Sequence, residues 1–429
     1  MNSRERVINA INHIQPDQVP VDLGATSQTG INASALCRLR KYYGLPEKPI
    51  EIYEMLQMLG FVDEDLRKIV RADVIGLELP YDSLGIDRTN VARKHFTMGD
   101  GTEVLFAQGN AWYEDASGAT YLYPQGDTSV QPSAVMPASG YFFDNIDRAE
   151  PIDEDHLTPR QDFETLFSVI NDDTAKYLEK NAAKLFDETE YAIIGNLGGG
   201  GLADPGIFPG PAEKKPKGIR RFDEWLLAHY LYPDYIKEVF EFQTEVMIKN
   251  LEIYKQAVGD RIQIVWISGT DFGTQSGAMM NLDMFREFYK PYYTRMNQWV
   301  HQNTGWKTFY HCCGSIVDFL DDFVDMGMDI LNPLQLSAKG MDAAMIKRKY
   351  GRKLVFWGGG IDTQNTLPNG SRDEIMNQVT ERMEILSEGG GYVFGAIHNI
   401  MGNVRPENIA SMFEAAHRCN EKFAEKNNM

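Results

Sequence analysis

The segment "YHCCGS", residues 310–315, places His311, Cys312 and Cys313 next to one another, and all three side chains can bind transition metals. The preceding "WKTF" predicts a strand, and the following "IVDFLDDFVDMG" predicts a helix. Because successive side chains of a strand point to opposite faces, His311 and Cys313 should share one face and Cys312 the other. An imidazole and a thiolate on one face supply two zinc ligands. Catalytic zinc usually takes three ligands from the protein and keeps a fourth position open.

A third ligand has to come from another strand. His398, in "YVFGAIHNI", is the other histidine near the end of a predicted strand, and we expect it to complete a zinc site with His311 and Cys313. The simpler interpretation is a packed strand end, because free cysteine is among the most buried residue types. Spacing alone favours packing, since a His-x-Cys pair is a weak pattern.

The elements that must position these residues follow from hydrophobic patterning. From about residue 190 onward, short apolar runs alternate with longer amphipathic ones, which predicts parallel strands joined by helices. Two earlier runs, "VPVDLG" (19–24) and "DVIGLELP" (73–80), predict further strands near helical sequence such as "EIYEMLQMLG" and "DEDLRKIV". The pattern fits a (β/α)8 TIM barrel better than an open doubly wound sheet. Residues 90–150 are turn-rich and β-prone, so we expect a small antiparallel β insertion within a single barrel domain of residues 1–429.

In such a barrel the carboxyl ends of the strands form the mouth where active sites are built. Asp271 in "ISGTDFGTQ" and Asp362 in "GGGIDTQ" each follow a strand, so either could orient a zinc ligand or donate a proton to a leaving oxygen. A helix N-cap explains each aspartate equally well. Asn332 and Gln335 of "NPLQ", and Asn196 of "YAIIGNL", are candidates for hydrogen bonding to a substrate.

The composition describes a globular, acidic protein. Lys+Arg total 42 and Asp+Glu 61, and the net charge of −19 argues against nucleic acid or an anionic membrane as a partner. The chain begins without an apolar signal region and contains no run of eighteen apolar residues, so we expect a soluble, cytoplasmic protein. Its four cysteines form no spaced disulfide framework, and a reducing compartment would keep them as thiols.

Three longer stretches, "YHCCGSIVDFLDDFVDMGMDILNPLQLSAKGMD", "LVFWGGGIDTQNTLP" and "HNIMGNVRPENIASMFEAA", resemble the uroporphyrinogen decarboxylase superfamily, and more closely its zinc- and corrinoid-dependent methyltransferase branch. The resemblance covers most of the chain and is densest from about residue 215 to 420. It implies a (β/α)8 barrel with its site at the C-terminal mouth. In that branch a His-x-Cys-Gly motif, matched by His311, Cys313 and Gly314, supplies two zinc ligands. A later cysteine supplies the third, and in this sequence the position aligned on "PENI" is His398.

The departure at His398 has a chemical consequence within that resemblance. One thiolate and two neutral imidazoles would leave zinc with a net charge of about +1, which makes it a stronger Lewis acid than a two-thiolate site. Such a metal suits a methoxyl group that leaves as an alkoxide or phenoxide, so we expect a small O-methyl donor such as a methoxylated aromatic. The Asp-x-His-x-x-Gly signature of corrinoid-carrying domains is absent, so the resemblance implies a Co(I) corrinoid brought by a partner protein. Dimers occur in this superfamily, so a homodimer is compatible with it.

A metal-free decarboxylase on the same fold is the alternative. In the decarboxylases an Arg-rich N-terminal stretch binds substrate carboxylates, but the matching "PVDLGATSQTGIN" contains no arginine. "RADVIGLELP" resembles the segment that carries the decarboxylases' central aspartate, which would be Asp73, although a strand-start or cap role explains Asp73 as well. The loop "GNLGGGGLADPG" lacks the ending of a phosphate-binding loop, and we interpret it as a tight, mobile loop that lines the pocket.

Overall fold

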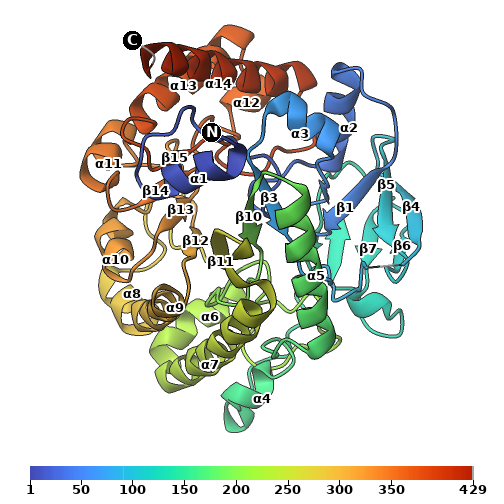
Figure 1. Cartoon of the computed structure of the whole chain (residues 1–429). Coiled ribbons are helices and arrows are strands. Elements are labelled where there is room, and N and C mark those ends of the chain that lie inside the picture. The colour runs from blue at the N-terminus through green and yellow to red at the C-terminus, as the bar shows by residue number, and fades with distance from the viewer. Residues whose placement is uncertain (90, 428–429) are drawn as a thin grey trace.

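The computed structural model describes residues 1–89 and 91–427. A parallel sheet of seven strands forms its centre, in the order β15-β14-β13-β12-β11-β10-β3, and helices surround this sheet (Figure 1). The strands are β3 (Val74–Leu77), β10 (Ala192–Gly195), β11 (Ile264–Ser268), β12 (Lys307–His311), β13 (Ile330–Asn332), β14 (Val355–Trp357) and β15 (Tyr392–Val393).

The backbone at residues 19–22 occupies the gap between the two edge strands of this sheet. On the β15 side, the N–H of Asp22 donates to the carbonyl of Phe394 at 2.8 Å. On the β3 side, the N–H of Asp73 donates to the carbonyl of Val21 at 2.7 Å. Val21 also forms a parallel bridge with Phe394. This segment closes the sheet, so the predicted TIM-barrel fold is confirmed.

The barrel interior is filled by apolar side chains that alternate along the strands. Helix α1 (Ser3–Ile11) covers one end of the barrel and contributes Val7, Ala10 and Ile11 to the interior cluster. The strand residues that alternate with these, such as Ile193 and Leu331, point outward and pack in the larger cluster that includes the surrounding helices. Burial on both faces explains why these strands are near-continuous apolar runs in the sequence. The strand residues of the interior cluster are Val74, Ala192, Ile194, Ile264, Trp266, Phe309, Ile330, Val355, Trp357 and Val393.

The outer helices begin at residues suited to capping. The side chains of Asn32, Asn171, Asn281 and Ser371 each accept a hydrogen bond from a backbone N–H in the first turn of the helix that follows. Among the described residues, no helix is long and apolar enough to cross a membrane. The helices are α2 (Ala33–Tyr42), α3 (Glu64–Val70), α4 (Pro159–Phe163), α5 (Asp172–Glu188), α6 (Phe222–Leu231), α7 (Pro233–Val258), α8 (Leu282–Phe288), α9 (Lys290–Asn303), α10 (Leu320–Asp325), α11 (Ala343–Tyr350), α12 (Thr366–Asn369), α13 (Arg372–Leu386) and α14 (Pro406–Asn427).

Two small sheets lie beside the barrel, at the right of Figure 1. The first has the order β2-β1-β5-β4, in which β1 and β5 are parallel and the other pairs antiparallel. The second has the order β6-β7-β8-β9 and is antiparallel throughout. Their strands are β1 (Ile50–Glu54), β2 (Leu59–Gly60), β4 (Arg93–Thr97), β5 (Glu103–Ala107), β6 (Trp112–Glu114), β7 (Thr120–Leu122), β8 (Ala134–Met136) and β9 (Asp144–Asn145).

The helix predicted for "EIYEMLQMLG", residues 51–60, is wrong. This segment forms β1, a turn and β2, because Ile50 and Glu51 pair with β5 and so satisfy the backbone within a sheet. The carboxylate of Glu54 accepts from the N–H groups of Leu56, at 3.1 Å, and Gln57, at 2.6 Å, which fixes the turn. The helix predicted from "DEDLRKIV" is confirmed as α3.

Candidate metal centre at the barrel mouth

The carboxyl ends of β11 and β12 bring three metal-binding side chains together. His311 is the last residue of β12, Cys313 follows it by two residues, and Asp271 lies in the loop after β11. One nitrogen of His311, the Sγ atom of Cys313 and one carboxylate oxygen of Asp271 all lie within 4.8 Å of one another. Nitrogen, thiolate sulfur and carboxylate oxygen are the ligand types that zinc takes in proteins, so the donor set fits this metal.

His311 is held in one orientation by Asn332. The Nδ1 atom of His311 lies 2.7 Å from Oδ1 of Asn332, and this oxygen can only accept a hydrogen bond. Nδ1 therefore carries the proton, which leaves a lone pair on Nε2. That Nε2 atom is 3.9 Å from Oδ1 of Asp271, on the side where the three donor groups meet. The buried His311 ring is thus oriented for metal binding through Nε2.

The loop after β12 is held by two side-chain acceptors. Oδ1 of Asp271 accepts from the N–H of Cys313 at 2.7 Å, and Oε1 of Gln335 accepts from the N–H of Gly314 at 2.7 Å. Gly314 has φ of +89°, and a Cβ atom there would lie 2.4 Å from a backbone carbon of Gly273, so this turn requires glycine. Burial, and after it the Asp271 carboxylate, raises the pKa of the Cys313 thiol. A bound cation would favour the thiolate.

Cys312 lies on the other side of the strand, as its position in the sequence predicts. It is buried in the outer hydrophobic cluster, and its Sγ atom accepts from the N–H of Phe272 at 3.3 Å. Burial raises the pKa of its thiol. Cys312 is therefore a packed residue, whereas Cys313 is the thiol of the candidate metal centre.

His398 lies beside His311 but outside the group of three donors. The two ring centroids are 5.1 Å apart, with the ring planes at 83°. Nδ1 of His398 accepts from the N–H of Asn399 at 2.8 Å, and because a neutral imidazole has one donor and one acceptor nitrogen, Nε2 carries the proton. Burial, and after it His311, lowers the pKa of His398 to about 3. His398 is thus a neutral hydrogen-bond donor in this arrangement.

Two cavities lie next to each other at the barrel mouth, because both are lined by His398 and Met401, and the second is also lined by Cys313 of the candidate metal centre. The first mouth cavity, of about 530 Å³, is lined on its other sides by residues that include Glu54, Phe142, Phe143, Asp204 and Trp266. The second mouth cavity, of about 570 Å³, is lined by residues that include Thr274, Gln275, Cys313, Gln335 and Gln364. Among the described residues that line either cavity, none is lysine or arginine.

Sequence reasoning missed Asp204 and Glu54, two of the three acidic residues that line the first mouth cavity. Asp204 comes from the glycine-rich loop after β10 and is 8% exposed, and its Oδ1 accepts from the N–H of Gly206 at 2.9 Å. Burial, with a smaller contribution from the charge of Asp271, raises the pKa of Asp204 to about 6. Burial also raises the pKa of Glu54 at the end of β1. The sequence did contain a signal for Asp204, because this acidic residue lies in the glycine-rich loop that follows a predicted strand.

Three other predicted site residues take different positions. Asp73 precedes β3 at the opposite end of the barrel, where it pairs with Arg6 at 2.6 Å and accepts from the N–H of Val21 at 2.9 Å. Asp362 accepts from the N–H of Gln364 in a turn after β14. Asn196 donates to the carbonyl of Ala25 at 2.8 Å and to Glu78, and its Oδ1 is buried without a partner. Of these three residues, only Asn196 both follows the carboxyl end of a strand and has a buried polar atom without a hydrogen-bond partner.

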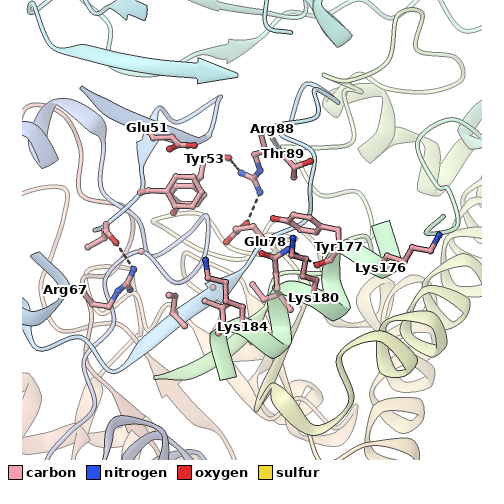
Figure 2. A pocket seen from close by; sticks show the side chains of 18 of the residues that line it. Glu51, Tyr53, Arg67, Glu78, Arg88, Thr89, Lys176, Tyr177, Lys180 and Lys184 are labelled. Atoms are coloured by element: carbon pink, nitrogen blue, oxygen red, sulfur yellow. Dashed lines mark hydrogen bonds and ion pairs between the residues drawn. The ribbon is translucent and has the colours of Figure 1, made fainter. Parts of the chain in front are cut away.

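A third cavity, of about 680 Å³, lies on the flank of the barrel between β3 and α5 (Figure 2). Its arginines are held by the protein itself: Arg67 donates to the carbonyl of Val74 at 3.1 Å, and Arg88 donates to the carbonyl of Leu79 at 2.8 Å. Lys180 and Lys184 reach from α5 toward these groups, whereas Lys176 extends away from them. The charged lining residues are Glu51, Arg67, Glu78, Arg88, Arg93, Asp173, Lys176, Lys180 and Lys184. Basic side chains therefore line a flank cavity and not the mouth.

Comparisons with known proteins agree with this architecture. Residues 214–419 match the sequence model of the family described as uroporphyrinogen decarboxylase (URO-D). No curated protein matches the chain. A solved structure described as a methyltransferase from Methanosarcina mazei superposes with a TM-score of 0.55 at 16% identity, over 97% of this chain and 99% of that one. At this identity the likeness shows the shared fold. The family match over residues 214–419 includes the segments that carry Asp271, His311 and Cys313.

Proposed function

We propose that this protein is a zinc-dependent methyltransferase that moves a methyl group from a small methylated donor to the Co(I) corrinoid of a partner protein. The observation that carries the proposal is the convergence of Asp271, His311 and Cys313 within 4.8 Å at the barrel mouth. The methyltransferase described for the structural neighbour supports the reaction class. When bound by these residues, zinc would supply a Lewis acid for the atom that loses the methyl group.

Asp271 is the third ligand that we favour, and His398 is the alternative predicted from the sequence. With Asp271, one thiolate and one carboxylate would cancel the charge of the zinc ion. With His398 in its place, the centre would keep a charge of about +1 and act as the stronger Lewis acid. The geometry supports Asp271, because His398 accepts a hydrogen bond at Nδ1 and carries its proton on Nε2.

The two mouth cavities suggest how donor and acceptor are arranged. The first mouth cavity, with aromatic walls from Phe143 and Trp266, suits a small O-methyl donor. The second mouth cavity borders Cys313 and would face the partner protein. His398 lines both cavities, and we propose that its N–H donates a hydrogen bond to the oxygen that loses its methyl group. Asp204 is a buried group that can exchange a proton near neutral pH.

The decarboxylase alternative receives less support from the mouth. A substrate with several carboxylates needs cationic partners, and none of the described residues lining the two mouth cavities is lysine or arginine. Asp73, the aspartate that the alternative requires, pairs with Arg6 at the far end of the barrel. The URO-D family match over residues 214–419 is common to both functions and does not separate them.

Metal content tests the proposal. Elemental analysis of purified protein should find about one zinc per chain, lost in His311→Ala and Cys313→Ala. Cys312→Ala is the matched control: it removes an adjacent thiol from the opposite face and should keep the metal. The zinc-loaded protein should then demethylate a methoxylated aromatic in the presence of a Co(I) corrinoid protein. Failure to take up supplied zinc, or equal metal loss in Cys312→Ala, would overturn the proposal.

A further inference from the structure

The charged groups around the first mouth cavity all have the same sign. Its lining contains the carboxylates of Glu54, Asp144 and Asp204, and among its described lining residues there is no lysine or arginine. Asp204 is buried and Glu54 lies at the cavity wall, so both carboxylates sit close to any molecule that fills the space. The neighbouring His398 does not offset them, because its Nδ1 accepts a hydrogen bond from the N–H of Asn399, and an imidazole with an accepting nitrogen carries no charge. The cavity therefore presents an uncompensated negative field.

The rest of the lining combines apolar and aromatic side chains with the neutral polar side chains of Ser27, Gln28, Gln57, Ser83 and Asn145. Phe143 is 4% exposed and Trp266 9% exposed, while Phe142 is 41% exposed and lies at the cavity rim. The Nε1 atom of Trp266 is buried and has no hydrogen-bond partner among the described residues. Aromatic faces attract cations as well as apolar rings, and the strength of this attraction rises when the cation loses its water. The aromatic walls and the carboxylates thus both favour a ligand that carries a positive charge.

The charge of the methyl donor would determine its affinity for the first mouth cavity. A donor carboxylate would lose its hydration and meet the carboxylates of Glu54, Asp144 and Asp204, with no lysine or arginine among the described lining residues to pair with, which is costly in a partly dehydrated cavity. An ammonium group would pair with Glu54 or Asp204 and could stack on an aromatic face. The flank cavity shows that this chain does place lysines and arginines around a cavity, although not around this one (Figure 2).

We propose that the first mouth cavity binds methoxylated aromatics that carry a positively charged substituent, accepts uncharged ones, and excludes those that carry a carboxylate. This inference rests on the proposed methyl transfer and names its substrate class. Glu54 and Asp204 are the specificity-determining residues, and Phe143 and Trp266 form the walls that hold the ring. The zinc ligands play no part in the discrimination.

Three ligands with the same methoxyarene and different charges test the inference. Guaiacol is neutral, its aminomethyl derivative is cationic, and its carboxylate derivative is anionic. Titration calorimetry with zinc-loaded protein, without corrinoid partner or turnover, should show the amine binding at least about tenfold more tightly than the carboxylate, or about 1.4 kcal/mol. The double variant Glu54→Gln and Asp204→Asn should reduce this preference to less than about threefold. Glu252→Gln, which removes one carboxylate from an exposed site on α7, should leave the preference unchanged.

Each outcome separates this inference from the function on which it rests. Equal or tighter binding of the carboxylate would overturn the charge selection, and methyl transfer would still stand on the zinc content and the His311→Ala and Cys313→Ala variants. Binding of none of the three ligands to zinc-loaded protein would overturn the assignment of this cavity to the donor. A preference that survives in the double variant would show that other groups select the charge, and would overturn the roles of Glu54 and Asp204.

Discussion

Nδ1 of His311 lies 2.7 Å from Oδ1 of Asn332, and Nδ2 of Asn332 donates to the carbonyl of Trp357 at 3.1 Å. The carbonyl can only accept, so it fixes the orientation of the Asn332 amide and, through it, the tautomer of His311. His311 and Asn332 are directly paired across β12 and β13, so the register of the barrel sets this bond. A metal-ligating histidine typically has an orienting partner of this kind.

Replacing Asn332 by alanine should weaken zinc binding by about 10- to 100-fold, because the His311 ring would lose its fixed orientation while all ligands remain. Competition with a chromophoric chelator measures the affinity. Asn332→Asp keeps an oxygen acceptor for Nδ1 of His311 and should retain more of the affinity than Asn332→Ala. An unchanged affinity in Asn332→Ala would show that Asn332 does not orient the ligand.

The third zinc ligand can be identified by comparing two variants. Asp271→Asn keeps an acceptor for the N–H of Cys313 but loses the charged ligand, so zinc affinity should fall by more than the roughly 100-fold typical of an orienting residue. His398→Gln should keep the metal and slow methyl transfer. The same chelator competition measures the affinities. Retained zinc in Asp271→Asn together with lost zinc in His398→Gln would assign the third position to His398.

The barrel was accessible from the sequence because its strands are buried on both faces. Runs such as "YAIIGNL" and "IQIVWISG" are mostly apolar, as is typical of parallel strands that are buried on both faces. The strand alternation around His311 also placed Cys313 with it and Cys312 away from it. The segment 51–60 was predicted wrongly, because its apolar residues satisfy either period and pairing with β5 decides between them.

The carboxylates of the first mouth cavity could not be placed from the sequence. Glu54 comes from a small sheet beside the barrel and Asp204 from a glycine-rich loop, so no periodicity fixes the position of either side chain. Asp73, which a family resemblance suggested for the active site, is different, because the sequence already predicts it at the start of a strand. Its position at the start of β3 places it at the amino end of the barrel.

Binding of a cationic donor should depend on pH through Asp204. Burial raises the pKa of this carboxyl to about 6, so affinity for the aminomethyl ligand should rise as pH increases from 5 to 7, because Asp204 becomes charged. The raised pKa also means that Asp204 favours folding most below about pH 4 and that this contribution is lost as pH rises through about 6, by at most on the order of 3 kcal/mol. Calorimetry and denaturation at each pH measure both trends. In Asp204→Asn, both the ligand affinity and the stability should depend less on pH. The charges of Asp271 and His311 also shift the pKa of Asp204. Identical profiles in the variant would refute the assignment.

Asp73→Ala should lower stability by about 2–4 kcal/mol and leave zinc content unchanged. The variant would leave Arg6 without its buried partner, 2.6 Å away, and would remove the acceptor for the N–H of Val21 in the segment that closes the barrel. Denaturation and elemental analysis on the same preparation test both parts. Loss of zinc from folded Asp73→Ala would contradict the placement of Asp73 away from the site.

The loop that carries Asp204 is anchored by a buried ion pair, and this anchor should be costly to break. Arg220 donates to Glu213 at 2.7 Å, and both side chains are at most 5% exposed; Arg220 also lies over the ring of Phe163 at 4.1 Å. Glu213→Gln keeps the shape but leaves the guanidinium uncompensated, so unfolding free energy should fall by about 3–5 kcal/mol. Glu47→Gln breaks the exposed pair with Lys41 by the same chemical change and should cost less than about 1 kcal/mol. Urea denaturation of the two variants measures the difference, and equal losses would show that the buried pair does not anchor the loop.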